Sequence, residues 1–321
     1  MKKEYLELLC DPFDQSELTL SDEEYNGDEI VSGTLNGKYE YRIKNGIPRF
    51  VKDEGYSDNF GYQWNRWARV QFEDENIDKP MQGYTENMFD LITRSAFKKV
   101  ENRIFLDIGC GPGRFADVIA NRGATVVCID YSSAIDAAKL NFKHKGFDIL
   151  FIQGDALQLP IKEGVIDHAY SIGVLHHTPN PGFGVVEANR VLKENGTFSL
   201  SVYRKGGYYD FAIVNLWRSF FKRIRPVLGN RPALTYSYVS GFIAFTLAKI
   251  WPPLAMPFRV IFSSVALPDL RWSILDTFDS ITPSYQSSHE THEVHDWFET
   301  ADFVEIKPGQ WGTTNFIGKK K

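Results

Sequence analysis

Five short apolar runs between Ile104 and Tyr203 constrain the fold of this chain more than any other feature of its sequence. The segments between them carry apolar residues at helical spacing, so short strands alternate with amphipathic helices. That alternation is typical of βαβ units, which set parallel strands side by side, and the sequence predicts an α/β fold. The expected strands are IFLDI (104–108), TVVCID (125–130), ILFIQ (149–153), HAYSI (168–172) and TFSLSVY (197–203).

The remainder of the chain divides into four segments around this region. Asn-Gly turns at 26–27, 36–37 and 45–46 predict a small β domain over residues 1–52. Residues 53–103 are expected to be partly helical, and the α/β core covers 104–205. A long aromatic-rich insertion at 206–290 is expected to be helical, and 291–321 should return to the core as a last helix and an antiparallel strand pair.

Composition excludes some classes of function. A net charge of −5 and a pI near 5.9 argue against a general nucleic-acid binder, which needs a broad basic face. The spacing of Cys10, Cys110 and Cys128 fits neither a disulfide framework nor a complete zinc site. The opening MKKEYLELLC lacks the long apolar run of a signal peptide, so we expect a cytoplasmic protein. From the net charge we expect no nucleic-acid partner.

The stretch LDIGCGPGR (106–114) is the clearest sign of a binding site. It runs from a strand into a glycine turn and then a helix, whose free N–H groups and positive dipole end would face a ligand. Arg114 stands where the dinucleotide fingerprint G-x-G-x-x-G would place its third glycine. This spacing counts against NAD and favours a methionine-nucleoside ligand.

Two carboxylates follow at successive strand ends. Asp130 closes the second expected strand, where it could accept hydrogen bonds from both ribose hydroxyls. Asp155 follows the third strand and could accept from an adenine amino group, with Ala156 and Leu157 beside it. Either acid alone would also fit a helix cap or a solvated turn, but together they favour a nucleoside site.

Five segments resemble, in order and spacing, the consecutive motifs of class I S-adenosylmethionine-dependent methyltransferases. They are LDIGCGPGRF, VVCIDYS, GDALQLPI, IDHAYSIGVLHHTPNP and RVLKENGTFSLSVY. The resemblance implies a Rossmann-like, seven-stranded methyltransferase sheet with one reversed strand, and S-adenosylmethionine as cofactor, released as S-adenosylhomocysteine. Asn195 departs from the proline usual in the family's turn before strand five, although Asn-Gly makes that turn equally well. The residues expected to hold the cofactor are Asp107, Gly109, Cys110, Gly111, Gly113, Asp130, Tyr131, Asp155, Ala156, Leu157 and Ile172.

The residues after the fourth strand face the transferred methyl group in this fold. Methyl transfer to a hydroxyl requires removal of a proton, and a histidine titrates near neutrality. His176 and His177 are therefore the candidate bases, with His176 expected to lie closer to the methyl group. The alternative is that both histidines shape the loop through hydrogen bonds to the backbone.

The N-terminal segment is similar to a small zinc-ribbon domain found beside some methyltransferases. LELLCDPFDQSEL and YEYRIKNGIPRF carry the likeness, but Phe13 occupies the second ligand position and residues 30–40 hold no cysteine. A structural zinc needs four N or S ligands, so we expect no metal. Phe13 is expected to replace the metal as an apolar centre.

Two further segments are expected to contact ligands. DNFGYQWNRWARVQ (58–71) looks like a segment that precedes the methyltransferase core in related bacterial enzymes, although an aromatic helix packed on the sheet is an alternative. Tyr62 and Gln63 are assigned there to the cofactor, and Trp64 and Arg66 to the substrate. LDTFDSITPSYQSSH should face the acceptor, or form an ordinary loop; its candidates are Asp279, Tyr285, Gln286 and His289.

The insertion has an unusual charge pattern. From Phe211 to Pro268 it contains seven basic residues and no acidic one. Its apolar run is too interrupted to predict a membrane span, but basic and aromatic residues together favour contact with a membrane surface. A helical lid over the site, a packed subdomain and a homodimer contact remain alternatives.

The sequence as a whole predicts a methyltransferase acting on a small or medium acceptor. O-methylation of a sugar, nucleotide-sugar or secondary metabolite comes first, and a lipid or quinone acceptor at the membrane surface comes second. A protein that binds the cofactor without turnover is a third alternative.

Overall fold

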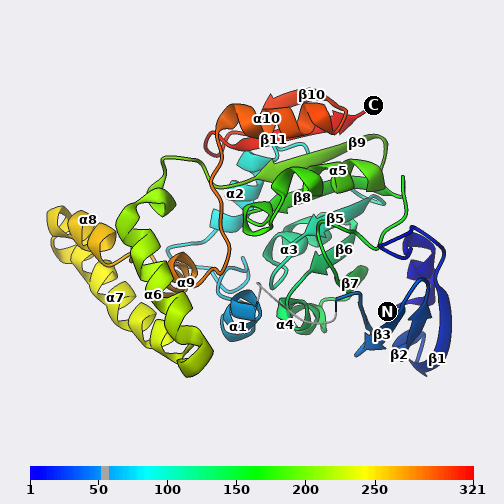
Figure 1. Cartoon of the computed structure of the whole chain (residues 1–321), viewed down its shortest axis with the longest axis horizontal. Helices are drawn as coiled ribbons and strands as arrows, with labels where there is room; N and C mark the ends of the chain where they lie inside the picture. Colours follow the sequence, from blue (N-terminus) through cyan, green and yellow to red (C-terminus); the bar gives the residue numbers. More distant parts are fainter. Residues whose placement is uncertain (52–57) are drawn as a thin grey trace.

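A computed structural model describes residues 1–51 and 58–321 of the chain (Figure 1). The five expected strands are present, and the helices between them begin where the apolar periodicity changes. The strands of this region are β5 (Ile104–Ile108), β6 (Thr125–Asp130), β7 (Ile149–Gln153), β8 (Ile166–Ile172) and β9 (Leu192–Ser201). The helices that connect them are α3 (Arg114–Asn121), α4 (Ala134–Phe142) and α5 (Pro181–Val191).

All strands join one sheet of eleven, in the order β1-β2-β3-β4-β7-β6-β5-β8-β9-β11-β10. The predicted count of seven is therefore not confirmed for the sheet as a whole. A continuous run from β7 to β10 nevertheless contains the expected arrangement, since β5 to β9 are parallel and β11 (Asn315–Lys320) pairs antiparallel with β9. β10 (Phe303–Pro308) pairs antiparallel with β11, which makes β11 the reversed strand.

Helices cover both faces of this run because its strands carry apolar side chains on both sides. On one face, Phe105 and Val126 pack with α3, α4 and α2 (Tyr84–Ile92). On the other, Leu106 and Val127 pack with α5 and α10 (Thr291–Thr300). Parallel strands buried on both faces place their carboxyl ends at one edge of the sheet, where ligands bind in open α/β folds.

The N-terminal hairpins are continuous with the sheet. They comprise β1 (Thr19–Asn26), β2 (Glu29–Asn36), β3 (Glu40–Lys44) and β4 (Ile47–Arg49), after the short helix η1 (Lys3–Leu8). β4 joins β7 through the single parallel pair Arg49–Gln153. Arg49 also forms an ion pair with Asp136 at 2.6 Å, which fixes this junction.

Asp11, and not Phe13, is the centre of the segment similar to a zinc ribbon. Its fully buried carboxylate accepts hydrogen bonds from the N–H groups of Phe13 (2.8 Å) and Lys38 (2.7 Å) and from the Tyr41 hydroxyl (2.9 Å). Phe13 is 48% exposed and packs edge-on against Tyr39 at the surface. The expectation of an apolar centre at Phe13 is therefore wrong, since a buried carboxylate ties the two loops together.

The insertion is helical, as expected, and most of it stands away from the sheet (Figure 1). Helix α9 lies between the core and the outer helices, and α1 (Asp58–Arg66) lies beside it. By length and composition alone, one helix in the described part of the chain could cross a membrane, Arg231–Ile250. The insertion helices are α6 (Ala212–Leu228), α7 (Arg231–Ile250), α8 (Pro252–Ile261) and α9 (Leu270–Ile281).

Candidate active site

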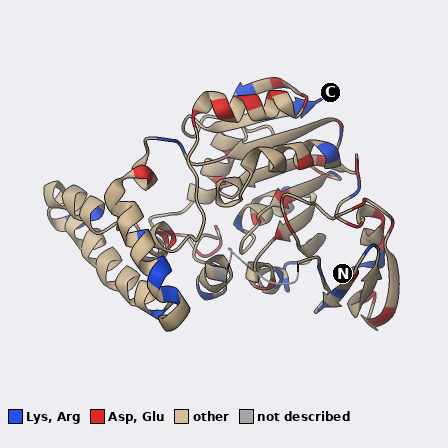
Figure 2. Cartoon of the chain, in the orientation of Figure 1, with Lys and Arg blue, Asp and Glu red and all other residues tan. Residues whose placement is uncertain are grey.

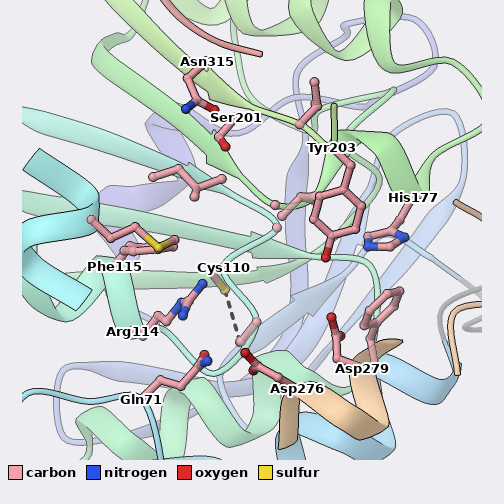
Figure 3. A pocket seen from close by; sticks show the side chains of 18 of the residues that line it. Gln71, Cys110, Arg114, Phe115, His177, Ser201, Tyr203, Asp276, Asp279 and Asn315 are labelled. Atoms are coloured by element: carbon pink, nitrogen blue, oxygen red, sulfur yellow. Dashed lines mark hydrogen bonds between the residues drawn. The ribbon is translucent and has the colours of Figure 1, made fainter. Parts of the chain in front are cut away.

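A cavity of about 550 Å³ opens at the carboxyl ends of β5, β6, β8 and β9 (Figure 3). The glycine turn after β5 forms one wall, and α9 forms the opposite wall. Most of the exposed lining is apolar, with a small number of charged and hydroxyl groups among aromatic rings. The lining side chains used below are Phe60, Trp64, Gln71, Arg114, Asp130, Tyr131, Ile172, His177, Tyr203, Tyr209, Trp272, Asp276 and Asp279.

The glycine turn is held to the end of β6 by backbone hydrogen bonds. The N–H groups of Gly109 and Cys110 both donate to the Ile129 carbonyl, at 2.8 and 3.0 Å. Gly109 has φ 78°, and a Cβ there would lie 2.2 Å from Val174, so no larger residue fits. A Cβ on Gly111 would lie 3.3 Å from the Trp64 indole. Glycine at these two positions thus lets the turn pack closely against Val174 and Trp64.

Asp130 lies at the edge of this space with one oxygen tied to the turn. Its Oδ2 accepts from the Gly111 N–H at 2.8 Å, and its Oδ1 accepts from the backbone and hydroxyl of Ser132 at 2.9 and 2.7 Å. Burial raises the pKa of Asp130. Each carboxylate oxygen can accept further hydrogen bonds, so Asp130 fits a pair of ribose hydroxyls.

Several residues assigned to the cofactor from the sequence line the cavity, and others support it from behind. Asp107 is buried beneath the turn, where it accepts from the Tyr170 hydroxyl at 3.1 Å and burial raises its pKa to about 8. Asp155 accepts a hydrogen bond from the Leu157 N–H at 2.8 Å. Asp107, Asp155 and Leu157 do not line the cavity, whereas Ala156 does. The cofactor candidates that line it are Gly109, Cys110, Gly111, Asp130, Tyr131, Ala156 and Ile172, whereas Gly113 faces the Phe142 ring.

Helix α1 contributes Trp64 and Phe60 to the cavity, but not its other predicted residues. Gln63 is fully buried and donates to Asp279 Oδ1 at 3.0 Å, so it positions that carboxylate. Tyr62 packs against the Phe278 ring, 5.9 Å away. Arg66 points outward, toward the Tyr238 hydroxyl at 3.3 Å. Because helical neighbours point in different directions, only part of the predicted group reaches the ligand space.

The structure reverses the expected order of the two histidines. His177 lines the cavity, and its Nδ1 lies 2.9 Å from the Tyr285 carbonyl oxygen. Burial lowers the pKa of His177, while the nearby Asp279 opposes that change. His176 is fully buried outside the cavity and stacks on Tyr203 with ring centroids 3.7 Å apart. Within the described residues neither His176 ring nitrogen has a hydrogen-bond partner, so His177 is the stronger candidate base.

The segment around 285–289 lies behind the histidines and does not line the cavity. Tyr285 is 41% exposed and contributes only its carbonyl group to His177. His289 bonds to Ser287 at 2.8 Å and to Glu293 at 2.9 Å. The buried Oε1 of Gln286 has no partner among the described residues. These three residues were expected to bind substrate, but none lines the cavity; the Tyr285 carbonyl contacts His177, and His289 contacts Ser287.

Sequence reasoning missed Asp276, one helical turn before Asp279 on α9. Burial and, after it, the nearby carboxylate of Asp279 raise its pKa to about 7, while Arg114 opposes them. An Asp-x-x-Asp spacing places two carboxylates on one helix face, and this signal could have identified Asp276 once Asp279 was selected. The two carboxylates face the cavity from its α9 wall (Figure 3).

Arg114 was noticed in the sequence only as a residue that is not glycine. It begins α3, and its guanidinium points into the cavity with no hydrogen bond or ion pair to the described residues (Figure 3). Burial lowers the pKa of Arg114. A cation at a helix N-terminus opposes the helix dipole, and this local cost was the available signal that the residue serves a ligand.

Aromatic rings form the remaining wall of the cavity. Tyr203 and Tyr209 stack nearly parallel, with centroids 4.3 Å apart and an interplanar angle of 11°. Trp272 of α9 is a further aromatic lining residue. Outside this site, the described residues include one group with the spacing of metal ligands, His295, Asp296 and Glu299 on α10, and it is largely exposed.

Comparison with known proteins identifies the domain that carries the glycine turn. Residues 106–200 match the family model described as a methyltransferase domain. The chain is 28% identical to the ubiquinone biosynthesis O-methyltransferase of Dechloromonas aromatica, over 50% of this chain and 68% of that protein. It is 30% identical to the enzyme of the same name from Pelagibacter ubique, over 46% of this chain and 57% of that protein.

Among solved structures, it is similar to an S-adenosylmethionine-dependent methyltransferase from Mesorhizobium loti. The identity is 24%, over 35% of this chain and 51% of that chain, with a TM-score of 0.32. The chain thus spans little more than half the length of most of these relatives. Residues 106–200 are thus similar to a methyltransferase domain, and these likenesses support a class I, S-adenosylmethionine-dependent methyltransferase.

Proposed function

We propose that this protein transfers a methyl group from S-adenosylmethionine to a hydroxyl oxygen of a small, ring-containing acceptor. One observation carries the proposal. The cavity joins a glycine turn and Asp130 at one end to His177 and the α9 carboxylates at the other. A cofactor at the first end and an acceptor at the second would lie within one space of about 550 Å³.

The residues at the first end fit the proposed cofactor. The turn at Gly109 and Gly111 would border its methionine part, Asp130 would accept from its ribose, and Tyr131 and Ala156 would flank its adenine. When bound, S-adenosylmethionine supplies a methyl carbon already activated by a sulfonium. The protein must then align the acceptor, exclude water and remove the hydroxyl proton.

His177 has the hydrogen bonding that a general base requires. A carbonyl oxygen only accepts, so His177 Nδ1 must carry the proton that it shares with Tyr285. In the neutral ring, Nε2 is then left as the acceptor on the side of the cavity. The lowered pKa of His177 keeps the ring neutral at pH 7. As the acceptor oxygen bonds to the methyl carbon, the carbon–sulfur bond would break to leave S-adenosylhomocysteine, and the hydroxyl proton would pass to Nε2.

The acceptor end favours a hydroxylated ring. Tyr203, Tyr209 and Trp272 offer flat apolar surfaces, while Asp276 and Asp279 can hold hydroxyl groups. A phenolic ring fits this combination, and the similarity to ubiquinone biosynthesis O-methyltransferases supports a quinone-like acceptor. Arg114 would bind an acidic substituent, because a buried guanidinium needs an anion.

A saccharide is the second candidate, and the pair of carboxylates favours it. Sugar hydroxyls donate to carboxylates, and sugar rings pack on aromatic faces. A nucleotide-sugar would also supply the anion for Arg114. A protein that binds the cofactor without turnover would share the same first end of the cavity, so only an activity measurement separates it from an enzyme.

The first test is to incubate the protein with methyl-labelled S-adenosylmethionine and an extract of its source cells, then to partition the product. Label in the organic phase supports a phenolic or quinone-like acceptor, and label in the aqueous phase supports a saccharide. Calorimetry with S-adenosylhomocysteine and NAD provides the control for the cofactor. Binding of NAD alone would contradict the proposal, and tight S-adenosylhomocysteine binding with no labelled product would favour the non-catalytic alternative.

A further inference from the structure

Helices α6, α7 and α8 expose large apolar side chains to an unusual degree. Most of the exposed large apolar side chains in the described part of the chain lie between Phe211 and Phe262. Val227 is 84% exposed, Ile250 77% and Trp251 60%. We call this the α6–α8 surface and define it by Val227, Leu228, Val239, Phe242, Ile250 and Trp251. Apolar patches of this extent mark interaction sites.

The polarity of α7 is reversed relative to a helix packed on a soluble core. Its inward face carries the small residues Ala233, Ser237, Gly241 and Ala244, all buried. A Cβ on Gly241 would lie 3.2 Å from the backbone of Ile274 on α9, so the two helices are in close contact. Phe242, 53% exposed, lies on the outward face. Burying small residues while exposing large apolar ones favours an apolar environment outside the helix.

The inward serines of α7 need no partner beyond their own helix. The Ser237 hydroxyl donates to the Leu234 carbonyl and the Ser240 hydroxyl to the Tyr236 carbonyl, both at 2.8 Å. The polar groups of α7 are therefore satisfied on the side that faces the protein, and its outward face is free to lose contact with water.

The charge of this region identifies the chemistry of its partner. Residues 211–268 carry seven basic residues and no acidic one, within a chain of net charge −5 (Figure 2). Arg223, Arg231 and Lys249 are exposed and form no hydrogen bond or ion pair with the described residues. Arg223 and Arg231 flank the turn between α6 and α7, and Lys249 lies at the opposite end of α7. Two basic ends thus flank one apolar face.

We propose that the α6–α8 surface docks on an anionic lipid bilayer, with α7 lying parallel to the membrane. Its large apolar side chains would enter the boundary between headgroups and acyl chains, and its basic ends would contact lipid phosphates. A symmetric contact with a second copy is disfavoured, since it would bring the basic residues of both copies together. A spanning orientation is disfavoured because it would separate α7 from α9.

Docking would place the cavity close to the lipid. Helix α9 contacts α7 through Ile274 and lines the cavity with Trp272 and Asp276. A lipid-soluble acceptor could then leave the membrane and enter the cavity along α9. This last step rests on the proposed function, whereas docking itself does not.

The experiment is sedimentation of the full chain with vesicles, without cofactor. Vesicles of phosphatidylcholine alone are compared with vesicles that also contain phosphatidylglycerol, at low and high salt. One variant removes apolar contacts (Phe242→Ser with Trp251→Ser), and another removes charge (Arg223→Gln, Arg231→Gln and Lys249→Gln). Leu140→Gln is the matched control, because Leu140 is 69% exposed on α4, outside the surface.

We expect binding to the anionic vesicles that weakens with salt and falls on the order of a hundredfold in each docking variant. The Leu140→Gln control should bind like the wild type. Absence of wild-type binding, or binding that both docking variants retain, would overturn the proposal. A dimer in solution that the same variants disrupt, without vesicle binding, would assign the surface to a second copy. S-adenosylhomocysteine binding, measured without vesicles, tests the proposed function separately.

Discussion

His177 and His176 are neighbours in the chain, yet their environments predict different responses to mutation. We expect His177→Ala to lower kcat by about 10²- to 10⁴-fold while S-adenosylhomocysteine affinity stays within a few-fold, because the ring would act only on the acceptor proton. His176→Phe should keep most activity, since a phenyl ring can replace the buried stack on Tyr203. Steady-state kinetics with a defined acceptor, beside calorimetry, provides the measurement.

The pH profile adds a second check on His177. Its pKa is lowered from the ordinary value of 6.5, so the acid limb of kcat/KM in the free enzyme should fall below that value. The base assignment fails if His177→Ala keeps full turnover or if the acid limb is unchanged in the variant.

Arg114 can serve either the acceptor or the carboxylate of the cofactor. We predict that Arg114→Gln raises the KM for the acceptor by about 10- to 100-fold, because a charge-assisted contact is lost. Its Kd for S-adenosylhomocysteine should change little. Arg114→Lys keeps the charge, so its KM for the acceptor should lie between those of the wild type and Arg114→Gln. A raised Kd with an unchanged KM would instead assign Arg114 to the cofactor, and no change in either constant would remove it from the site.

At the scale of elements, the glycine turn depends on two separate constraints at Gly109. Gly109→Ala would force an alanine into the left-handed conformation at φ 78°, and its Cβ would overlap Val174 Cγ1 at 2.2 Å. Gly146→Ala is the control, since Gly146 has φ 66° with nothing within 4 Å of its Cβ. We expect the control to lose about 1–2 kcal/mol of unfolding free energy, and Gly109→Ala to lose roughly a further 1–3 kcal/mol.

Adding Val174→Ala to Gly109→Ala isolates the overlap. The double variant should recover part of the additional loss, as measured by chemical denaturation and a double-mutant cycle. Equal stability of Gly109→Ala and Gly146→Ala would show that the overlap costs nothing.

Apolar periodicity identified elements well and the directions of side chains poorly. The five core strands appeared where expected because strand and helix periods differ clearly over buried segments. The order of His176 and His177 could not be read from sequence, because both lie on one turn of the short helix η3 (Leu175–His177) and point to different sides. Arg114 and Asp276 were missed although local spacing contained a signal for each.

At the scale of the whole molecule, buried carboxylates give the stability a defined dependence on pH. The pKa of Asp107 is raised from 3.8 to about 8 by burial. Between those values the folded state keeps a proton that the unfolded state has lost, so the unfolding free energy falls as pH rises. Asp107→Asn should remove this decline and stabilise the protein at pH 8 by roughly 1–3 kcal/mol relative to the wild type.

Asp148 is the control, because its pKa is shifted in the opposite direction to that of Asp107 and its effect on stability therefore has the opposite pH dependence. Burial acts to raise its pKa, but hydrogen bonds from Lys2 and Tyr5 outweigh burial and lower it. Asp148 therefore stabilises the fold above its unfolded pKa, and this stability is lost as pH falls. Asp148→Asn should destabilise the protein at neutral pH. Thermal unfolding from about pH 3 to pH 8 checks both variants, because Asp148 titrates below its ordinary value of 3.8 and Asp107 above it. Parallel curves for Asp107→Asn and the wild type would contradict the assignment.

The full extent of the sheet could not be predicted from the sequence. Asn-Gly turns identified the N-terminal hairpins, but nothing local could show that β4 pairs with β7, about a hundred residues further along. The same limit applies to the cavity, whose walls come from α1, β5, β9 and α9. Local patterns specify elements, whereas pairings between distant segments depend on the folded whole.

The pairing of β4 with β7 also sets an order of events during synthesis. Ile30, Leu35 and Phe50 belong to one apolar core with Leu150, Leu159 and Ile161, and Leu9 forms a bridge with Ile161. The first fifty residues leave the ribosome well before those partners exist. Until then the hairpins have an unpaired strand edge and an uncovered apolar face. Residues 1–50 are therefore made before the segments that complete their core, and until then they stay accessible to chaperones and proteases in the nascent chain.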